Sequence, residues 1–507
     1  MLKITLRRPL GLILICLAYA LAFACGGSTN HAAAPQPHQA LWFSDLHFNP
    51  FADPAIVPDL AAQDASQWPT LLAGSPIHSQ KPGTGQESNQ WLLEQSLTQM
   101  RAQLPQPDFI IFTGDFLSHW FNETYAEVTG DTSEAGLHAF IDKTLTHISS
   151  RFDYYYPNTP VYFCLGNNDS YAGDYLESAG SPFLTASAQI LGPRLLKDEG
   201  NLQLLFATYP QGGYFEADLA GTGGRILSLD ANFLSVHAPQ TAEASAETQL
   251  DWLASRLSDA AGHGDKVWVL LHIPPGVDVY ATLAANNGEE VPPTVVSLMR
   301  ENHLARLKGL FIEYASTIPA VLAGHIHRDD FRLLLADDGH GASVLVIPSI
   351  SPVYANNPTY KVLDYSPDTF AIQDCATWYL DGHDGEWKLG QRFSQAYGVE
   401  MLNAASLHQL WLDLRTDTSL QTEYALAYNG FRGVDEIGAD FRYYWAAMGA
   451  MEADGFRNAL SDWAGGADTA PAAWLWSEST SHQPAVSPLS VQLWMVDGSA
   501  GAAPGMR

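Results

Sequence analysis

The chain has 507 residues, 25 basic and 55 acidic side chains, a formal net charge of −30 and only four cysteines. Hydrophobic residues make up 46% and charged residues 16%, a globular composition that excludes disorder over most of the chain, and the length exceeds one ordinary domain. The acidic excess excludes a protein that grips nucleic acid through a basic surface, so any phosphate-bearing ligand must find its positive charge locally.

The first 24 residues are typical of a signal peptide. Lys3, Arg7 and Arg8 form a positively charged start, and residues 10–23 form an apolar run. No other stretch of the sequence approaches the length that a membrane-spanning helix needs. Cleavage removes these three basic residues and no acidic one, so the formal charge changes from −30 to −33. We therefore expect an exported protein.

The end of this signal leaves two processing routes open. Small residues before position 25 suit ordinary cleavage, whereas Cys25 followed by Gly-Gly-Ser resembles the start of a bacterial lipoprotein. The first route gives a secreted protein, and the second gives a periplasmic or cell-surface lipoprotein attached to the membrane through lipidated Cys25. Both routes remove Cys16. With Cys25, Cys164 and Cys375 left, a scaffold built on several disulfides is excluded, and whether Cys164 and Cys375 pair stays open.

Residues 25–38 are polar and contain proline, which predicts a tether. Beyond the tether, short apolar runs alternate with amphipathic segments. This pattern predicts strands at residues 40–43, 109–112, 161–165, 267–271 and 320–323, and helices at residues 91–100, 140–148, 249–257 and 302–314. Such alternation is typical of an α/β layered sheet with helices on its faces, and we expect this domain to span residues 39–385.

After about residue 385 the pattern becomes helical. Helices are predicted at residues 402–414, 420–428 and 441–460, with no further unit of a strand followed by a polar turn, and the small residues from Asp497 onward predict a frayed end. We therefore expect residues 386–507 to form a C-terminal helical subdomain and tail. The sequence leaves open whether these helices form a separate unit or a cap on the sheet domain.

Five short polar motifs each follow an apolar run. They are Asp45-Leu46-His47, the segment from Gly114-Asp115 to His119, Gly166-Asn167-Asn168-Asp169, His272-Ile273-Pro274-Pro275 and Gly324-His325-Ile326-His327. Ligands of open α/β sheets bind outside the carboxyl ends of the strands, so these side chains predict a metal site there. Imidazole, carboxylate and amide donors suit zinc, manganese or iron. Seven ligands exceed the need of one tetrahedral ion, and we expect two divalent metal ions that share Asp115.

The spacing within the motifs supports this interpretation. Asp45 and His47 are two residues apart, as are His325 and His327, and on extended backbone such pairs project to the same side. The glycines at 114, 166 and 324 would let the chain turn sharply as it leaves the sheet. Taken singly, each motif has a structural explanation, such as an N-capping aspartate or a polar turn. Five such motifs after five apolar runs make a metal site the better account.

The five motifs resemble those of the calcineurin-like metallophosphoesterases. Finer features resemble the acid sphingomyelinase-like phosphodiesterases, a branch that also includes vacuolar endopolyphosphatases. These features lie at residues 44–50, Asp115 with His119, 229–233, 272–276, 324–329, 348–352 and 356–358. The resemblance runs from about residue 40 to about residue 385. It implies a four-layer α/β/β/α sandwich, in which two sheets are flanked by helices, and the final helices are compatible with that family's C-terminal subdomain.

The resemblance also implies a role for each candidate residue. One metal ion would be held by Asp45, His47 and His327, the other by Asn167, His272 and His325, with Asp115 bridging. His119 matches a histidine that the family places near the leaving group. The family's usual Gly-Asn-His is Gly-Asn-Asn here, so Asn168 replaces a histidine thought to assist the leaving group. His119 and Asn168 are thus the further catalytic candidates, with His119 as the general acid.

The expected reaction is hydrolysis of phosphodiester or phosphoanhydride bonds. Two cations would lower the pKa of a shared water, so that metal-bound hydroxide attacks the phosphorus while the ions clamp the phosphate oxygens. A phosphate-ester small molecule or lipid headgroup ranks first as substrate, because a charge of −33 opposes a long polyanion. An endopolyphosphatase-like hydrolase is the alternative enzyme. A non-catalytic exported binding lipoprotein is the alternative outside enzymes.

Overall fold

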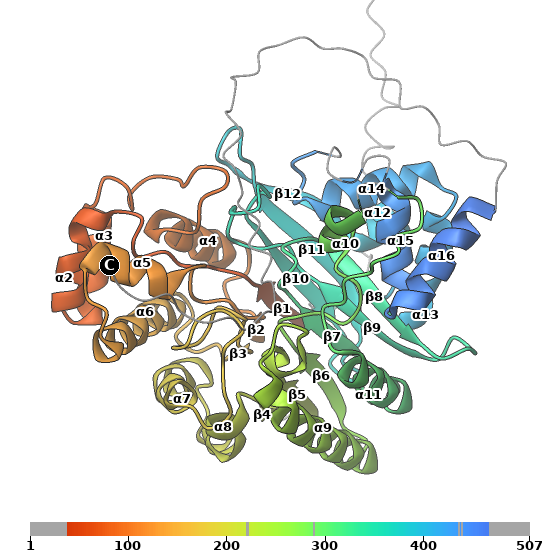
Figure 1. The fold of residues 1–507 in the computed structure, drawn as a ribbon, viewed down its shortest axis with the longest axis horizontal. Coiled ribbons are helices and arrows are strands. Elements are labelled where there is room, and N and C mark those ends of the chain that lie inside the picture. Colours follow the sequence, from red (N-terminus) through yellow and green to blue (C-terminus); the bar gives the residue numbers. More distant parts are fainter. Residues whose placement is uncertain (1–37, 220–222, 287–288, 434–436, 438–439, 466–507) are drawn as a thin grey trace, which may run out of the picture. The chain divides into compact units, whose positions relative to one another are not determined.

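The computed structural model describes residues 38–219, 223–286, 289–433, 437 and 440–465 (Figure 1). The predicted signal peptide, Cys25 and the tail beyond residue 465 lie outside the described residues. His38, which the sequence assigned to the tether, already pairs with Tyr365 in a strand. Among the described residues, the helices are all too short or too polar to cross a membrane.

The first sheet contains six strands in the order β12-β11-β10-β1-β2-β3. The strands are β1 (His38–Phe43), β2 (Phe109–Phe112), β3 (Val161–Phe163), β10 (Thr359–Tyr365), β11 (Ile372–Leu380) and β12 (Trp387–Arg392). Strands β1, β2 and β3 are parallel, whereas β10, β11 and β12 extend the sheet with antiparallel pairing. The carboxyl ends of β1, β2 and β3 therefore meet at one edge.

The second sheet also contains six strands, in the order β4-β5-β6-β7-β9-β8. These are β4 (Phe215–Leu219), β5 (Gly224–Ser228), β6 (Lys266–Leu270), β7 (Ala320–Ala323), β8 (Asp330–Leu335) and β9 (Gly341–Val346). Strands β5, β6, β7 and β9 are parallel, and β4 and β8 pair antiparallel at the two margins.

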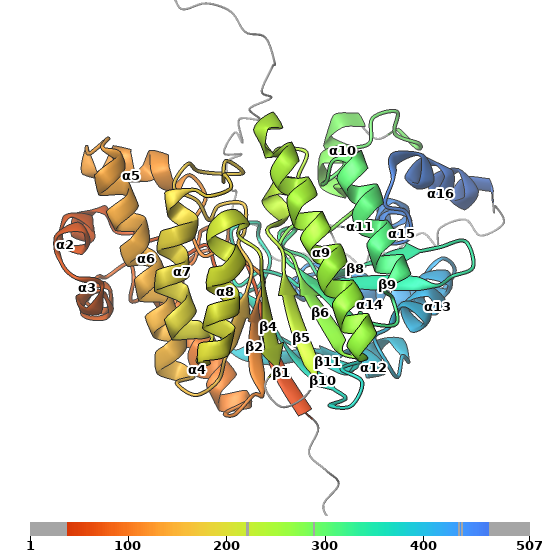
Figure 2. The same ribbon diagram turned by 90° about the horizontal axis from the view of Figure 1, so that it is seen from below.

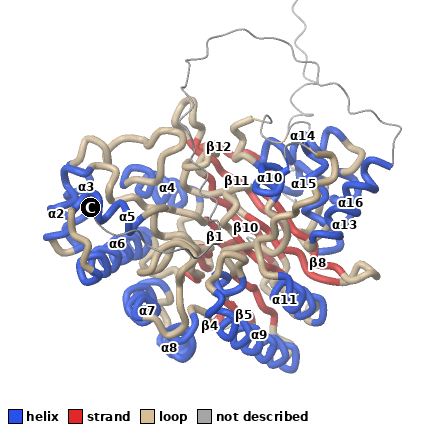
Figure 3. The backbone as a smooth tube through the Cα atoms, in the orientation of Figure 1, coloured by secondary structure: helices blue, strands red, loops and turns tan. Residues whose placement is uncertain are grey.

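Helices connect and cover the strands, as Figures 2 and 3 show. They are α2 (Val57–Ala62), α3 (Trp68–Gly74), α4 (Gln90–Gln103), α5 (Phe121–Thr129), α6 (Glu134–Tyr155), α7 (Pro182–Leu195), α8 (Glu199–Gly212), α9 (Glu243–His263), α10 (Val279–Asn286), α11 (Glu301–Glu313), α12 (Phe393–Tyr397), α13 (Ala404–Leu414), α14 (Thr418–Tyr428), α15 (Phe441–Gly449) and α16 (Ala453–Gly465). Helices α6, α7 and α8 pack side by side, and α9 packs against α11.

The alternation of side chains along β6 shows how the layers pack. Trp268 and Leu270 lie in the core shared with the first sheet, where the Trp268 ring lies 5.3 Å from the Phe109 ring. Val267 and Val269 point the other way, into the core beneath α9 and α11. A strand buried on both faces needs this continuous apolar sequence. The predicted four-layer α/β/β/α sandwich is confirmed.

Several predicted elements lie where the sequence placed them. Strands 109–112 and 320–323 coincide with β2 and β7. The helix predicted at 140–148 is only the middle of α6, which begins after Ser133, whose hydroxyl accepts from the backbone N–H of Gly136. Residues 134–139 of α6 are exposed or only partly buried, so the apolar pattern begins several residues after the cap.

The C-terminal region differs from the prediction in two ways. Strand β12 lies beyond residue 385 and pairs with β11, so the region expected to be helical begins with a strand that belongs to the first sheet. The helix predicted at 441–460 is two helices, because Ala450 adopts extended backbone between α15 and α16. Helices α13 and α15 pack on β8, and the described residues up to Ala464 belong to one compact unit.

Candidate metal centre

All seven predicted metal ligands leave the carboxyl ends of strands. Asp45 and His47 follow β1, Asp115 follows β2, Asn167 follows β3, His272 follows β6, and His325 and His327 follow β7. Because three of these strands belong to the first sheet and two to the second, the loops of both sheets face one another. The structure brings the seven side chains into one cluster, in which six are buried and His325 is partly exposed.

One half of the cluster gathers the first predicted ligand set. His327 Nε2 lies 3.0 Å from His47 Nε2 and 3.3 Å from Asp45 Oδ1. His47 Nε2 in turn lies 3.3 Å from Asp115 Oδ2. Asp45, His47 and His327 therefore offer donor atoms close enough to hold one ion together.

The other half gathers the second predicted set. Asn167 Oδ1 lies 3.1 Å from His272 Nε2 and 2.9 Å from His325 Nδ1. His272 Nε2 lies 3.2 Å from Asp115 Oδ2. One oxygen of Asp115 thus lies within 3.3 Å of a histidine nitrogen of each set. This is the position that a bridging ligand needs.

The ligand-bearing loops have an unusual backbone. Asp45, His47, Asp115, His325 and His327 all have positive φ, between 44° and 72°. This left-handed region disfavours residues with a Cβ, and such strain concentrates at functional sites. The expectation that the two Asp/His and His/His pairs share extended backbone is therefore wrong, although their side chains do converge. Hydrogen bonds from Asp45 N to Gly114 O and from His47 N to Asp115 O hold the strained loops together.

Two of the motif glycines serve close approach rather than a turn. A Cβ on Gly166 would lie 2.1 Å from Asp115 Oδ1, and a Cβ on Gly324 would lie 2.6 Å from Asp45 Oδ2. Only Gly114 combines such crowding with a positive φ, of 95°. The glycine at 166 is thus needed because a carboxylate occupies the space of its side chain, and at 324 the hydroxyl of Ser44 and the carboxylate of Asp45 occupy that space together.

The histidine tautomers suit metal ligation. His47 Nδ1 lies 3.1 Å from the carbonyl oxygen of Leu117, and His272 Nδ1 lies 2.7 Å from that of Thr113. Since a carbonyl only accepts, each Nδ1 donates its proton, and Nε2 is the nitrogen of each ring that remains for a metal ion or a second proton. Both of these Nε2 atoms face Asp115 Oδ2, so acceptor atoms meet where a cation would satisfy all of them.

The charges in the cluster also fit a bound cation. Burial lowers the pKa values of His47 and His327 well below their usual range, so these rings are neutral. Burial raises the pKa of Asp45 to about 7. Burial also disfavours charge on His272, but the carboxylates of Asp115 and Asp45 raise its pKa to about 10. The space between the two carboxylates therefore favours positive charge, which a divalent ion supplies.

The two further catalytic candidates lie at different places. Asn168 donates from Nδ2 to Asp115 Oδ2 at 3.0 Å and from its backbone N–H to Asp115 Oδ1 at 2.9 Å, so it supports the bridging carboxylate. His119 stacks on His47 with ring centroids 4.1 Å apart. Its Nδ1 lies 2.6 Å from Glu87 Oε1. Burial disfavours charge on His119, but the hydrogen bond and charge of Glu87 raise its pKa overall.

Sequence reasoning missed several residues that support the cluster. Asp169 is buried and accepts from the backbone N–H groups of Asp115 at 3.0 Å, Phe116 at 2.9 Å and Gly166 at 2.8 Å. Asp174 accepts from Asn167 Nδ2 at 2.7 Å, which turns Oδ1 of that amide toward the two histidines. Asp169 is the last residue of one of the five polar motifs, but its role in holding the loops was not predicted. Asp174 lies in a loop that contains no recognisable motif.

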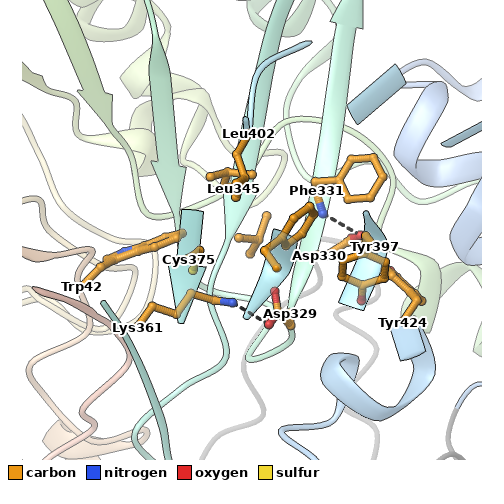
Figure 4. A pocket seen from close by; sticks show the side chains of 12 residues that line it. Trp42, Asp329, Asp330, Phe331, Leu345, Lys361, Cys375, Tyr397, Leu402 and Tyr424 are labelled. Atoms are coloured by element: carbon orange, nitrogen blue, oxygen red, sulfur yellow. Dashed lines mark hydrogen bonds and ion pairs between the residues drawn. The ribbon is translucent and has the colours of Figure 1, made fainter. Parts of the chain in front are cut away.

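A separate narrow cavity lies between the sheets (Figure 4), lined by residues of both. Lys361 of β10 pairs there with Asp329, and Asp330 accepts from the hydroxyl of Tyr424 at 2.7 Å. Asp329 and Asp330 directly follow the segment that carries His327. The cavity thus holds no cluster of metal ligands, but its ion pair fixes the end of a ligand-bearing loop against the first sheet.

Comparisons with known proteins agree with this geometry. The sequence model of the calcineurin-like phosphoesterase family matches residues 39–329. An acid sphingomyelinase-like phosphodiesterase 3b from Homo sapiens is 26% identical over 420 residues, covering 77% of this chain and 83% of the relative. The cyclic GMP-AMP phosphodiesterase SMPDL3A from Rattus norvegicus is 28% identical over 331 residues, covering 62% and 68%. The sphingomyelinase phosphodiesterase C from Dictyostelium discoideum is 25% identical over 375 residues, covering 68% and 76%.

The predicted resemblance is confirmed, because the family match spans more than half of the chain and the relatives align over most of their length. The family binds divalent metal ions, and the described residues include two overlapping groups of donors that suit them. The chain belongs to the calcineurin-like phosphoesterase family, in the branch of the acid sphingomyelinase-like phosphodiesterases, and is a metal-dependent phosphoric ester hydrolase.

Proposed function

We propose that the protein is an exported phosphodiesterase that works with two divalent metal ions and hydrolyses small phosphodiesters. The observation that carries this proposal is the position of Asp115 Oδ2, within 3.3 Å of one histidine nitrogen from each ligand set. A single-ion site would need no shared carboxylate between two groups of donors. Mixed imidazole and oxygen donors favour zinc, with manganese or iron as alternatives.

The proposed reaction assigns each residue a task. Bound divalent ions would supply the charge that activates water and neutralises the phosphate oxygens. Asp169 holds the two loops that flank the bridging carboxylate, and Asn168 holds the carboxylate itself. A carboxamide is too weak an acid to give up a proton, so Asn168 can donate a hydrogen bond but cannot protonate a leaving group. His119 is the remaining candidate for that transfer.

The surroundings of His119 favour substrates with an aromatic or cationic group beside the phosphate. Trp120 is 68% exposed and Tyr354 is 52% exposed, and the Tyr354 hydroxyl lies 3.2 Å from His119 Nε2. Exposed rings at such a place would stack on a nucleobase or hold a quaternary ammonium group. Nucleotide phosphodiesters and phosphocholine lipids both offer these features. The names of the relatives include a cyclic dinucleotide and sphingomyelinases.

Metal removal tests the proposal. We expect the purified protein to contain close to two divalent ions per chain and to hydrolyse bis(p-nitrophenyl) phosphate, and we expect a chelator to abolish turnover until the metal is returned. A panel of sphingomyelin, a cyclic dinucleotide, a nucleoside triphosphate and polyphosphate then identifies the substrate class. Metal analysis that finds one ion or none in a fully active protein would contradict the two-ion proposal.

The proposal of export rests on the N-terminal sequence, and the relatives named above give no information on lipidation. We propose that Cys25 is lipidated after removal of residues 1–24. Expression in the native host with radiolabelled palmitate should label the wild-type protein and leave a Cys25→Ser variant unlabelled. An unlabelled wild-type protein in the culture medium would instead establish ordinary secretion.

A further inference from the structure

Glu87 makes two contacts with His119 through a single oxygen. Glu87 Oε1 lies 2.6 Å from His119 Nδ1 and also accepts from the backbone N–H of His119 at 3.2 Å. Both side chains are largely shielded, with 13% of the Glu87 side chain and 20% of the His119 side chain exposed. A carboxylate that holds both the backbone and the ring of one residue fixes the orientation of that ring.

The segment that carries Glu87 is itself tied to the metal centre. Phe48 forms a parallel bridge with Ser88 on one side and with Leu117 on the other. Phe48 follows the candidate ligand at position 47, Ser88 follows Glu87, and Leu117 lies two residues before His119. Three segments that are distant in sequence therefore meet at Phe48, which bridges to both of the others. The next residue, Asn89, is the N-cap of α4, so the segment that carries Glu87 is also attached to a helix.

Of the two ring nitrogens of His119, Nε2 is the one that could transfer a proton to a substrate. One face of the His119 ring stacks on the His47 ring, with the ring centroids 4.1 Å apart, and Nδ1 of His119 is hydrogen-bonded to Glu87. The remaining nitrogen, Nε2, lies within hydrogen-bond distance of the hydroxyl of the exposed Tyr354, 3.2 Å away. A leaving oxygen would take the place of that hydroxyl to reach Nε2.

We infer that Glu87 is a positioning residue for His119: it holds the imidazole so that Nε2 faces the leaving group of the substrate. The inference rests on the proposed phosphodiesterase function. In the transfer, a water oxygen bonds to phosphorus as the bond between phosphorus and the leaving oxygen breaks, and the leaving oxygen takes the proton from His119 Nε2. Glu87 touches neither the substrate nor the ions in this arrangement. Glu87 acts on the reaction only through the His119 ring.

The test compares a p-nitrophenyl ester with a phenyl ester of the same phosphodiester. The nitrophenolate leaves without a proton, whereas the phenolate needs one. We expect Glu87→Ala to lower kcat for the phenyl ester about 10- to 100-fold, with little change in KM, and to leave the nitrophenyl ester nearly unaffected. Glu87→Gln keeps an acceptor at the same place and should retain most of the activity.

A double-variant comparison separates positioning from general damage. Glu87→Ala combined with His119→Ala should lose no more activity than His119→Ala alone, because both changes remove the same proton transfer. Glu94→Ala is the matched control, since Glu94 is a half-buried glutamate that pairs with Arg151 at 2.6 Å instead. It should leave the ratio of the two esters unchanged.

Two results would overturn the inference: equal losses on both esters, or a double variant clearly slower than His119→Ala. Failure of the proposed function looks different. A metal-loaded wild type that hydrolyses neither ester would reject the phosphodiesterase activity, and the role of Glu87 with it.

Discussion

Asp115→Asn is expected to lower kcat/KM by about 10³-fold, the scale seen when a charge-stabilising group is lost from a preorganised site. The substitution preserves the shape of the side chain but removes the negative charge shared by the two ligand sets. The carboxamide can keep its oxygen on the backbone N–H of Asn168, which lies 2.9 Å from Asp115 Oδ1. Its NH₂ group then replaces Oδ2, which lies 3.2 Å from His272 Nε2 and 3.3 Å from His47 Nε2.

This exchange predicts a folded protein that has lost metal. An NH₂ group can donate to the Nε2 lone pair of the neutral His47, but it meets the NH₂ group of Asn168, which donates to Asp115 Oδ2 in the wild type. We therefore expect the thermal midpoint of the metal-free variant to fall below that of the metal-free wild type, because His272 loses a carboxylate 3.2 Å away and Asn168 loses its acceptor. Metal content should fall below two ions per chain. A variant that keeps both ions and stays within tenfold of wild-type activity would show that Asp115 does not bridge.

The matched control is Asp108→Asn. Asp108 is a half-exposed aspartate that pairs with His38 at 2.8 Å and lies at the start of β2 rather than at its carboxyl end. Its substitution should leave metal content and kcat/KM unchanged, because an exposed ion pair contributes little to stability. A comparable loss of activity in this control would mean that Asp115→Asn acts by disturbing β2 as a whole.

The clustering of the seven candidate ligands could be predicted from the sequence because it follows from sheet topology. In parallel sheets the carboxyl ends of strands share an edge, so a polar motif after each apolar run marks the same place in space. The apolar run of β2 and the Gly-Asp after it illustrate this. The distances between the motifs did not have to be known, because the parallel strands of a sheet bring their carboxyl ends to the same edge.

The supporting residues could not be predicted in this way. Glu87 lies in a loop before α4 with no strand ahead of it, and it reaches His119 only through the bridge at Phe48. The strain of the ligand loops was equally invisible. A left-handed conformation at Asp45 or His325 depends on hydrogen bonds to other loops, and the identity of the residue itself argues against it.

Gly166→Ala is the second change with a large expected effect. The added Cβ would lie 2.1 Å from Asp115 Oδ1 and 2.3 Å from the backbone nitrogen of Asp115. A backbone nitrogen cannot relieve the clash by a rotamer change, so the loops after β2 and β3 must move apart. We expect a loss of about 10²-fold in kcat/KM, since a displacement of about 1 Å at a catalytic group has this effect. Overpacking of this kind destabilises a protein by about 1–3 kcal/mol.

Gly309→Ala is the control for the added methyl group. Gly309 lies within α11, and a Cβ there meets no atom within 4 Å. Alanine should stabilise that helix by about 0.4–1 kcal/mol and leave activity unchanged. Comparison of kcat/KM, metal content and thermal midpoint for the two variants isolates the close approach at Asp115. Wild-type activity in Gly166→Ala would mean that the two loops can move apart without cost, and that the contact between Gly166 and the bridging carboxylate has no part in holding the ions.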